Sequence, residues 1–336
     1  MRALVLTGPS RAAVQEVPDP VPGLGEVLVE VERAGICGTD VELFTGGLSY
    51  LQTGVTAYPV RPGHEWCGTV TAAGPGTDPS WLGRRVTGDT MIGCGRCPRC
   101  RAGRHHVCAD RDEVGIRGAI AGALAERLVV PARTLHALPP SLDAELGALV
   151  EPGGNALRAV LAANVSAGER LLILGTGTIG LLAALFARSR GAEVHLLGRD
   201  PEQLALARSL GFPGGLRAEL PPLPWDAVLD ATNDPAAPAL ALDLVEPGRR
   251  IVYIGLSGVP STVDTRELAL KDVTAVGILG ASAGLPGAVA AYADGSVGPH
   301  PLIGATIGLE EVAAALAGRR PSAAGPGPKL LVDPGR

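Results

Sequence analysis

Hydrophobic residues along the chain fall into short apolar runs separated by longer segments of mixed character, a pattern that is typical of strands alternating with helices. The run Leu171–Leu174 is followed directly by a glycine-rich turn and predicts a buried parallel strand. A helix, a strand and a second helix are predicted next, up to Gly211. Residues 225–232, 249–256 and 272–279 predict three further strands of the same sheet.

Other elements are predicted at both ends of the chain. Residues 1–10 predict a first strand. Residues 308–318 predict a helix and residues 328–334 a late strand, with a flexible loop between them. Residues 212–224 are few and rich in proline, so we expect the third strand of the parallel sheet and its helix to be trimmed.

Length and composition set the class of protein. The chain has 336 residues, more than one hydrophobic core usually serves, so two domains are expected. Hydrophobic residues make up 46% of the chain and aromatic residues only 3%, which is typical of an α/β protein with a buried parallel sheet.

Charge and hydropathy exclude several classes of partner. The formal net charge is −5 and no long basic stripe occurs, which argues against nucleic acid. Two uncharged runs, Leu171–Ala187 and Val273–Ala293, are interrupted by glycine, so no membrane span is expected. The apolar part of residues 1–10 is too short for a secretory signal, so we expect a cytoplasmic protein whose thiols stay reduced.

Four cysteines lie close together in one loop, namely Cys94, Cys97, Cys100 and Cys108. In a reducing compartment this spacing favours zinc, which accepts four thiolates tetrahedrally with no open position. A redox pair is one alternative, but such a pair usually opens a helix in a βαβ unit. A nucleic-acid zinc ribbon is another, suggested by the arginines and histidines of the loop, but the rest of the chain is acidic. Cys67 is expected to pack in the core.

A second set of candidate metal ligands lies in three glycine- or proline-marked turns that are far apart in sequence. These ligands are Cys37, His64 with Glu65, and Glu151. A single histidine before a strand is usually structural. A cysteine, a His-Glu pair and a further glutamate, each in such a turn, are less easily explained by chance and favour a metal site. Three protein ligands with one labile position are the pattern of a catalytic zinc.

The turn after the first parallel strand has the sequence Gly175-x-Gly177-x-x-Gly180 and predicts a dinucleotide site. The first glycine allows the tight turn, the second lets the backbone approach a pyrophosphate, and the third lets helix pack on strand. The backbone N–H groups at the start of the new helix, where Thr178 and Ile179 lie, are expected to face that phosphate.

The end of the next strand indicates which dinucleotide is expected. An NAD enzyme usually has an acidic residue there on the ribose 2′-OH, whereas this chain has Gly198 followed by Arg199. A missing carboxylate removes repulsion, and an arginine can bind a 2′-phosphate, so NADP(H) is favoured over NAD(H). Asp200 is either a displaced ribose ligand or the N-cap of the helix that Pro201 opens.

Five motifs and the four-cysteine loop together carry a resemblance to a known family; the motifs are GICGTD, PGHEW, LVEPGGNALRAV, LLILGTGTIGLLAA and KLLVDP. With these features the chain resembles the zinc-dependent medium-chain dehydrogenases/reductases. The resemblance covers nearly the whole chain and implies an α/β fold with a GroES-like β-rich catalytic domain over residues 1–148. A Rossmann doubly wound parallel-sheet domain would cover residues 149–282, and residues 283–336 would return to the catalytic domain. The resemblance also implies a structural zinc in a lobe at about residues 93–109, besides the catalytic zinc.

Within this family the chain has mixed features. Glu151 in place of a cysteine ligand is similar to sorbitol, glucose and 2-deoxy-scyllo-inosamine dehydrogenases. Sorbitol and threonine dehydrogenases carry a relay histidine five positions after the first zinc cysteine, where this chain has Glu42. The stretch CGTDVELFTGG and the long segment between Cys37 and His64 resemble glucose dehydrogenases, whereas PGHEW and VTGDTMIGCGRC resemble aminocyclitol dehydrogenases.

The resemblance implies interconversion of a secondary alcohol and a ketone. Zinc would lower the pKa of the bound alcohol, and hydride would pass to the nicotinamide. Thr39 stands where the family has a relay hydroxyl, and Glu42 and Glu65 are further candidate catalytic residues. Alternatively, Thr39 caps a helix that begins at Asp40.

A polyol, sugar or aminocyclitol is the expected substrate, because Glu65 and Glu151 offer acceptors for neighbouring hydroxyl or ammonium groups. The long segment before His64 supplies polar side chains that are candidates to line the cleft, namely Ser49, Tyr50, Gln52 and Tyr58. The alternative is a surface loop whose two tyrosines pack on the domain.

Three rival functions are a general zinc alcohol dehydrogenase or ketoreductase, a zinc-free reductase of activated C=C bonds, and a zinc-ribbon binding protein. Intact Cys37, His64 and Glu151 argue against the zinc-free reductase, and the glycine motif argues against the binding protein. The expected partner is a small polar alcohol or ketone, and a homodimer or homotetramer is expected.

Overall fold

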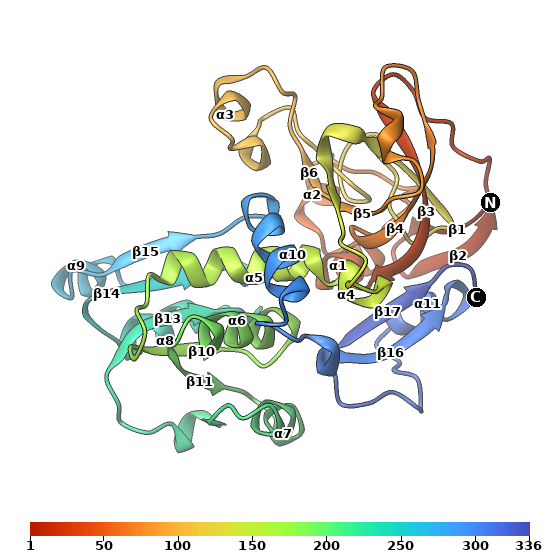
Figure 1. Cartoon of the computed structure of the whole chain (residues 1–336). Coiled ribbons are helices and arrows are strands. Elements are labelled where there is room, and N and C mark those ends of the chain that lie inside the picture. The colour runs from red at the N-terminus through yellow and green to blue at the C-terminus, as the bar shows by residue number, and fades with distance from the viewer. The chain divides into compact units, whose positions relative to one another are not determined.

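The computed structural model describes residues 1–336, which divide into two compact units. The first unit consists of Met1–Glu151 and Ile303–Arg336, and the second of Pro152–Leu302. Figure 1 shows the first unit in red to yellow with the last blue segment, and the second in green to light blue.

The chain returns to the first unit at Ile303 rather than at residue 283, where the sequence analysis placed the return. Helix α10 (Leu285–Ala293) accounts for the difference, because it packs within the second unit. There Tyr292 stacks on Phe186, with 5.9 Å between the ring centroids.

A seven-stranded sheet forms the core of the first unit, in the order β16-β17-β3-β4-β5-β9, with β8 paired to β3. Along β3 the residues Val27, Val29 and Val31 are buried while their neighbours are more exposed, the period of two that places one face of a strand in the core. On β4, Cys67 is fully buried as predicted, and burial raises the pKa of its thiol. The strands of this unit are β1 (Arg2–Gly8), β2 (Arg11–Glu16), β3 (Glu26–Gly35), β4 (Glu65–Ala73), β5 (Arg85–Gly88), β6 (Met91–Ile92), β7 (Asp112–Glu113), β8 (Arg127–Pro131), β9 (Leu135–Ala137), β16 (Ile303–Gly308) and β17 (Lys329–Asp333).

Short helices connect these strands. The helix α1 follows β3 directly and ends at Gly46, whose φ of +83° is the left-handed conformation that glycine adopts readily at a helix end. The predicted helix and late strand near the C-terminus are α11 and β17, which belong to this unit. The helices are α1 (Gly38–Thr45), α2 (Ser49–Gln52), α3 (Pro98–Arg101), α4 (Ala144–Ala148) and α11 (Leu309–Leu316).

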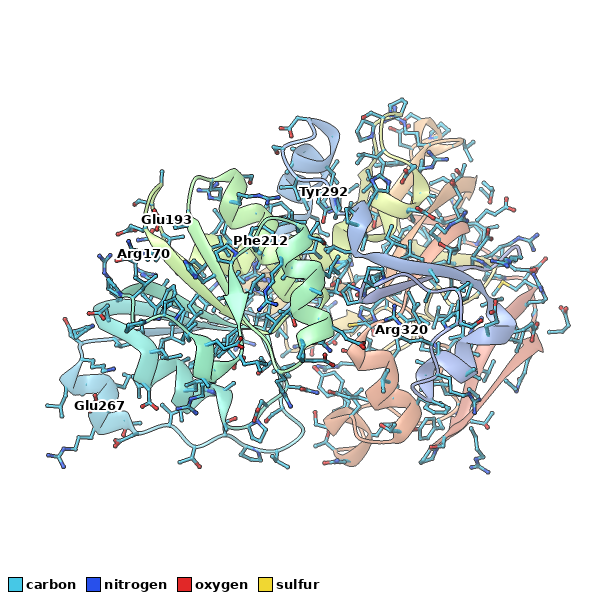
Figure 2. The ribbon with its side chains drawn as sticks, turned by 90° about the horizontal axis from the view of Figure 1, so that it is seen from below. Arg170, Glu193, Phe212, Glu267, Tyr292 and Arg320 are labelled. Carbon is cyan, nitrogen blue, oxygen red and sulfur yellow. The ribbon has the colours of Figure 1, made fainter.

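The second unit contains a six-stranded parallel sheet in the order β12-β11-β10-β13-β14-β15. The central strand β10 is the buried apolar run that the sequence predicted, and the third strand β12 is trimmed to Gly214–Gly215. At the amino ends of β10 and β11, Arg170 and Glu193 form an ion pair at 3.1 Å, and both are labelled in Figure 2. The other strands are β10 (Arg170–Leu174), β11 (Glu193–Leu197), β13 (Trp225–Asp230), β14 (Val245–Tyr253) and β15 (Thr274–Gly277).

Helices join the parallel strands of this sheet. In α6 every residue from Gly180 to Ala187 is buried, so this helix lies inside the unit rather than on its surface. None of the helices in the structure is long and apolar enough to cross a bilayer. The remaining helices are α5 (Val150–Ala163), whose first residues belong to the first unit, α6 (Thr178–Ser189), α7 (Pro201–Ser209), α8 (Ala237–Leu244) and α9 (Thr265–Leu270).

Candidate metal centres and cofactor site

The four clustered cysteines converge on one point of the first unit. Their sulfur atoms all lie within 4.8 Å of one another, and none forms a disulfide. The sulfurs of Cys97 and Cys108 are 3.7 Å apart. Two thiolates on one tetrahedral zinc, at about 2.3 Å each, stand about 3.8 Å apart. The four thiols therefore fit a closed zinc site.

The electrostatics of this group also fit a cation. Hydrogen bonds from the backbone N–H groups of Arg96 and Cys97 lower the pKa of Cys94 to about 6. Burial and the neighbouring thiolates raise the pKa of Cys100 to about 11. The loop thus stabilises some thiolates, while their crowding resists full ionisation. A divalent cation among the sulfurs removes that resistance, since coordinated thiols are deprotonated.

The local fold of the lobe explains how the sulfurs meet. Cys97 is the N-cap of α3, with Pro98 at the first helical position, and its sulfur accepts the backbone N–H of Cys100 at 3.4 Å. The guanidinium of Arg99 donates to the carbonyl of Val107 at 3.0 Å and closes the loop. The short helical turn therefore brings Cys97 and Cys100 together, and the closed loop brings Cys94 and Cys108 to them.

A second cluster brings together Cys37, His64 and Glu65, whose ligand atoms lie within 4.8 Å of one another. Antiparallel pairing of β3 with β4 sets Gly35 opposite Glu65, so the ends of these strands deliver the three side chains to one place. A Cβ at Gly35 would overlap the Glu65 carboxylate, so a side chain there would displace this carboxylate from Lys329. His64 and Glu65 are almost fully buried, and Cys37 is partly buried.

Asp40 supports this cluster from the first turn of α1. Its carboxylate is buried, accepts the backbone N–H of Cys37 at 2.9 Å and lies 3.7 Å from Nδ1 of His64. The longer distance is an electrostatic attraction rather than a hydrogen bond. Burial alone would lower the pKa of His64, but the negative charges of Asp40 and Cys37 raise it well above its usual value. The same negative field favours a metal cation.

Lys329 is a member of the site that the sequence analysis did not identify. Its ammonium group is buried and lies 2.6 and 2.8 Å from the two carboxylate oxygens of Glu65. It also donates to the carbonyl of Ile36 at 2.9 Å. Burial opposes the charge of Lys329, but Glu65 and Cys37 outweigh it and raise the pKa of the ammonium. Glu65 is therefore held by a cation of the protein itself.

Glu151 lies near this cluster but is not one of the three closely spaced ligands. It is buried at the start of α5, and its charge contributes to the raised pKa of Lys329. Thr39 lies inside the first turn of α1, whose N-cap is Cys37, so the alternative in which Thr39 caps a helix beginning at Asp40 is wrong. Glu42 is half-buried on the same helix, and burial raises its pKa.

In the long segment between Cys37 and His64, both tyrosine hydroxyls form hydrogen bonds with other residues of the protein. Tyr58 donates to the carbonyl of Leu43 at 2.5 Å. Tyr50 donates to Glu113 at 3.0 Å and accepts from Arg111 at 2.9 Å. These contacts favour the packed-loop alternative for both tyrosines over a cleft lining.

The glycine turn of the second unit has the expected form. Gly175 follows β10 with φ of +107°, and Gly177 is the N-cap of α6, with open space where a side chain would stand. A Cβ at Gly180 would overlap the carbonyl oxygen of Gly175, so only glycine lets helix and turn approach this closely. Thr178 and Ile179 form the first turn of α6. A phosphate can approach the free N–H groups of this helix end.

The end of β11 carries Gly198 where NAD enzymes have an acidic residue, and the side chain of Leu204 packs close to it. A Cβ at Gly198 would lie 2.8 Å from a side-chain carbon of Leu204. Asp200 caps α7, accepting the backbone N–H of Glu202 at 2.8 Å, which is the N-cap alternative of the sequence analysis. Arg199 is 67% exposed and lies 3.7 Å from Asp234. Arg199 is thus available to an anion beside the glycine turn, in competition with Asp234.

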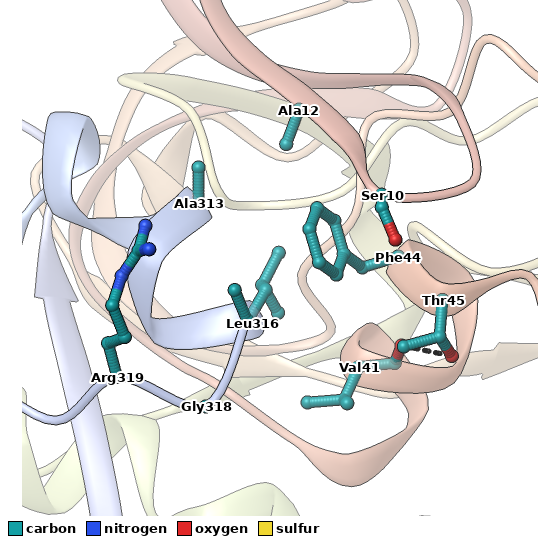
Figure 3. A pocket seen from close by; sticks show the side chains of 10 residues that line it. Ser10, Ala12, Val41, Phe44, Thr45, Ala313, Leu316, Gly318 and Arg319 are labelled. Carbon is teal, nitrogen blue, oxygen red and sulfur yellow. Dashed lines mark hydrogen bonds between the residues drawn. The ribbon is translucent and has the colours of Figure 1, made fainter.

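A separate pocket of about 680 Å³ lies in the first unit between α1, α11 and the turn that joins β1 to β2. Figure 3 shows Phe44 and Leu316 in the middle of its lining side chains and Arg319 at their edge. None of the candidate metal ligands lines it. This pocket is therefore distinct from both metal clusters.

Two family models match the chain. The alcohol dehydrogenase GroES-like domain matches residues 23–140, and the zinc-binding dehydrogenase model matches residues 178–294. Among curated proteins, the L-threonine 3-dehydrogenase of Saccharopolyspora erythraea is 33% identical over 83% of this chain and 84% of its own length. That of Coxiella burnetii is 31% identical over 80% of each.

Solved structures give the same result for the whole chain. An alcohol dehydrogenase from Thermus sp. ATN1 has a TM-score of 0.89 and 29% identity over 99% of both chains. A structure from Sinorhizobium meliloti, described as a zinc-binding dehydrogenase bound to NADP, has a TM-score of 0.89 and 30% identity over 99% of both chains. Galactitol-1-phosphate dehydrogenase from Escherichia coli has a TM-score of 0.88 and 27% identity, covering 99% of this chain and 100% of that one.

Proposed function

The chain belongs to the zinc-binding medium-chain alcohol dehydrogenase family, and from this premise we propose that it interconverts a secondary alcohol and a ketone on a polyol, sugar or aminocyclitol, preferring NADP(H). Membership of the family makes it an oxidoreductase of CH–OH groups with a zinc and a nicotinamide cofactor. The observation that carries the finer proposal is the buried cluster of Cys37, His64 and Glu65, with Lys329 as its counter-ion.

Two zinc sites per chain are proposed. The lobe site would use Cys94, Cys97, Cys100 and Cys108 and would be structural, because four thiolates leave no open position. The catalytic site would use Cys37, His64 and Glu151. In this arrangement Glu65 stays paired with Lys329, and the charges of Cys37 and Glu151 balance those of a divalent metal. When bound, this zinc would polarise the alcohol oxygen and favour loss of its proton.

The residues of the chain orient the reacting groups and carry the proton. Asp40 attracts the imidazole of His64 and fixes the loop of Cys37 through a backbone hydrogen bond. Thr39, in the first turn of the same helix, would accept the proton of the alcohol and pass it toward bulk water. Glu42 lies one turn further on, and its raised pKa makes it a candidate acceptor in that path.

The cofactor would be held at the carboxyl edge of the parallel sheet. Gly175, Gly177 and Gly180, with the N–H groups of Thr178 and Ile179, would bind the pyrophosphate. A bound NADP would present its 2′-phosphate near Gly198, which carries no acidic side chain, and Arg199 would pair with it. The nicotinamide would supply the hydride chemistry.

The polar substrate class is proposed from the charged groups at the metal cluster. Glu65 is paired with Lys329 and Glu151 would bind the metal, but each carboxylate keeps lone pairs that would accept from a hydroxyl or ammonium group beside the reacting carbon. L-Threonine, named for the curated relatives, is the second candidate. It is less favoured because threonine dehydrogenases carry a histidine where this chain has Glu42.

A substrate panel tests this proposal. The kcat/KM for NADP-dependent oxidation is measured for an inositol, an aminocyclitol, glucose, L-threonine and cyclohexanol. The proposal expects at least one polyhydroxylated substrate to exceed cyclohexanol clearly. A clear preference for cyclohexanol contradicts it and indicates a general alcohol dehydrogenase, whereas a preference for threonine supports the second candidate.

A further inference from the structure

A buried polar network joins the four-cysteine lobe to the segment 46–59, which lies between Cys37 and His64 in sequence. Arg111 is the centre of this network. Its guanidinium donates to the carbonyl of the lobe cysteine Cys108 at 3.2 Å, to the carboxylate of Glu113 at 2.7 Å and to the hydroxyl of Tyr50 at 2.9 Å. Tyr50 in turn donates to Glu113 at 3.0 Å. The lobe and the segment are therefore bonded to the same guanidinium.

The charged pair at the centre of the network is largely shielded from water, whereas Tyr50 is partly buried. The side chains of Arg111 and Glu113 are 13% and 4% exposed. The guanidinium of Arg117 lies over the ring of Tyr50, 5.8 Å from its centroid. Charge-assisted hydrogen bonds in such surroundings are stronger than those at a surface, and a buried charge without its partner is costly. The arrangement is therefore specific rather than incidental.

The same network also lies one strand away from the second metal cluster. Strand β7, which contains Glu113, pairs with β6, and Met91 faces Glu113. The residue before this pair, Thr90, accepts the backbone N–H of Val114 at 2.9 Å and donates through its hydroxyl to the carbonyl of His64 at 3.2 Å. The network thus connects three parts of the first unit: the lobe, the segment 46–59 and the histidine of the second cluster.

We propose that Arg111 is a positioning residue that couples metal binding in the lobe to the order of segment 46–59. The proposal rests on the lobe binding zinc, as proposed above. Zinc fixes Cys108, the carbonyl of Cys108 fixes Arg111, and Arg111 fixes Tyr50. Coupling of this kind is reciprocal, so a change at Tyr50 must also change the binding of zinc in the lobe. The lobe would then serve the catalytic site by holding the segment that joins Cys37 to His64 along the chain.

Tyr50→Phe is the decisive variant, because it removes one hydroxyl and keeps the ring. Zinc release from the two-zinc protein to a chromogenic chelator is followed in time, and the phase that belongs to the lobe is identified with Cys37→Ala. Hydrogen exchange of residues 49–58 is measured on the same samples. Tyr50→Phe removes two hydrogen bonds, one with Glu113 and one with Arg111, and only the second leads directly to the lobe. We expect the variant to release the lobe zinc about two- to tenfold faster, the factor for the bond with Arg111, and to exchange faster in the segment.

Tyr58→Phe is the matched control. Its hydroxyl also anchors the segment, but to Leu43 rather than to the lobe. We expect this variant to leave the release of lobe zinc unchanged. Release from Tyr50→Phe at the parent rate, or equal acceleration by both variants, contradicts the coupling. If the parent protein carries no zinc on the four thiols, both the coupling and the assignment of the lobe as a zinc site are wrong. The zinc count distinguishes this result from one in which zinc is bound but the coupling is absent.

Discussion

Replacing Lys329 by methionine removes the cation that contacts Glu65, and we expect a large loss of stability in the first unit. The two side chains are only 4% and 2% exposed, and their charged groups lie 2.6 Å apart. An exposed pair of this kind contributes about 0–1 kcal/mol. Breaking a buried pair costs about 3–5 kcal/mol, because the remaining charge has no partner. We expect the lower end, about 3 kcal/mol, because a bound zinc near Glu65 compensates part of its charge.

Urea unfolding at pH 7 in the presence of zinc measures this loss. Tryptophan fluorescence follows the transition of the first unit through Trp66, which is fully buried there. The double variant Glu65→Gln/Lys329→Met should recover most of the lost stability, since it removes both charges. Lys271→Met is the control, because Lys271 lies in the second unit and donates only to backbone carbonyls, at 2.8, 3.0 and 3.4 Å, so it should leave the transition of the first unit unchanged.

Two results would refute this reasoning. The first is a Lys329→Met variant within about 1 kcal/mol of the parent, the value of an exposed pair. The second is a double variant that is no more stable than Lys329→Met alone. Either result would mean that the ion pair with Glu65 is not what makes Lys329 important.

Three further predictions concern the lobe, the cofactor and pH. Cys100→Ser should lower the thermal midpoint by several degrees, because structural zinc contributes folding energy; calorimetry that shows an unchanged midpoint contradicts a structural role. Arg199→Ala should weaken the binding of NADPH relative to that of NADH by about 1 kcal/mol, roughly fivefold. This is the low end for a charge-assisted pair, because Arg199 is 67% exposed and faces Asp234. Titration of both cofactors checks this, and an NADH preference in the parent contradicts it. Burial alone would raise the pKa of Glu32, but hydrogen bonds from Arg85 and Thr69 lower it. Ionised Glu32 therefore stabilises the fold above about pH 4.3, and this stabilisation is lost as the pH falls through the lowered pKa. Glu32→Gln should therefore lose less stability than the parent between pH 5 and pH 3 in urea titrations, and equal losses in the two proteins would contradict this assignment.

The parts of the site that sequence alone predicted are those that depend on local spacing. The four cysteines lie within one loop, so their separation already limits how their sulfurs meet. The glycine turn depends on backbone freedom at Gly175 and on close packing at Gly180, both of which are properties of one residue type. The short third strand followed from the few, proline-rich residues before Trp225.

The parts that sequence alone missed depend on strand register and on contacts between distant residues. Lys329 meets Glu65 across 264 positions because β17 pairs with β3, and hydrophobic periodicity does not specify that pairing. A weak signal existed, since nearly all other basic residues of the chain are arginine. Tyr50 was a candidate for the cleft because its partner Glu113 lies 63 positions away, on a strand of two residues.

If the chain holds one catalytic and one structural zinc, a count of bound zinc must find both. Elemental analysis is carried out on the purified parent and on Cys37→Ala, which removes one ligand of the second cluster and leaves the lobe intact. The account predicts two zinc ions per chain in the parent and one in the variant. One zinc ion per chain in both proteins would contradict the catalytic site and the proposed function that depends on it.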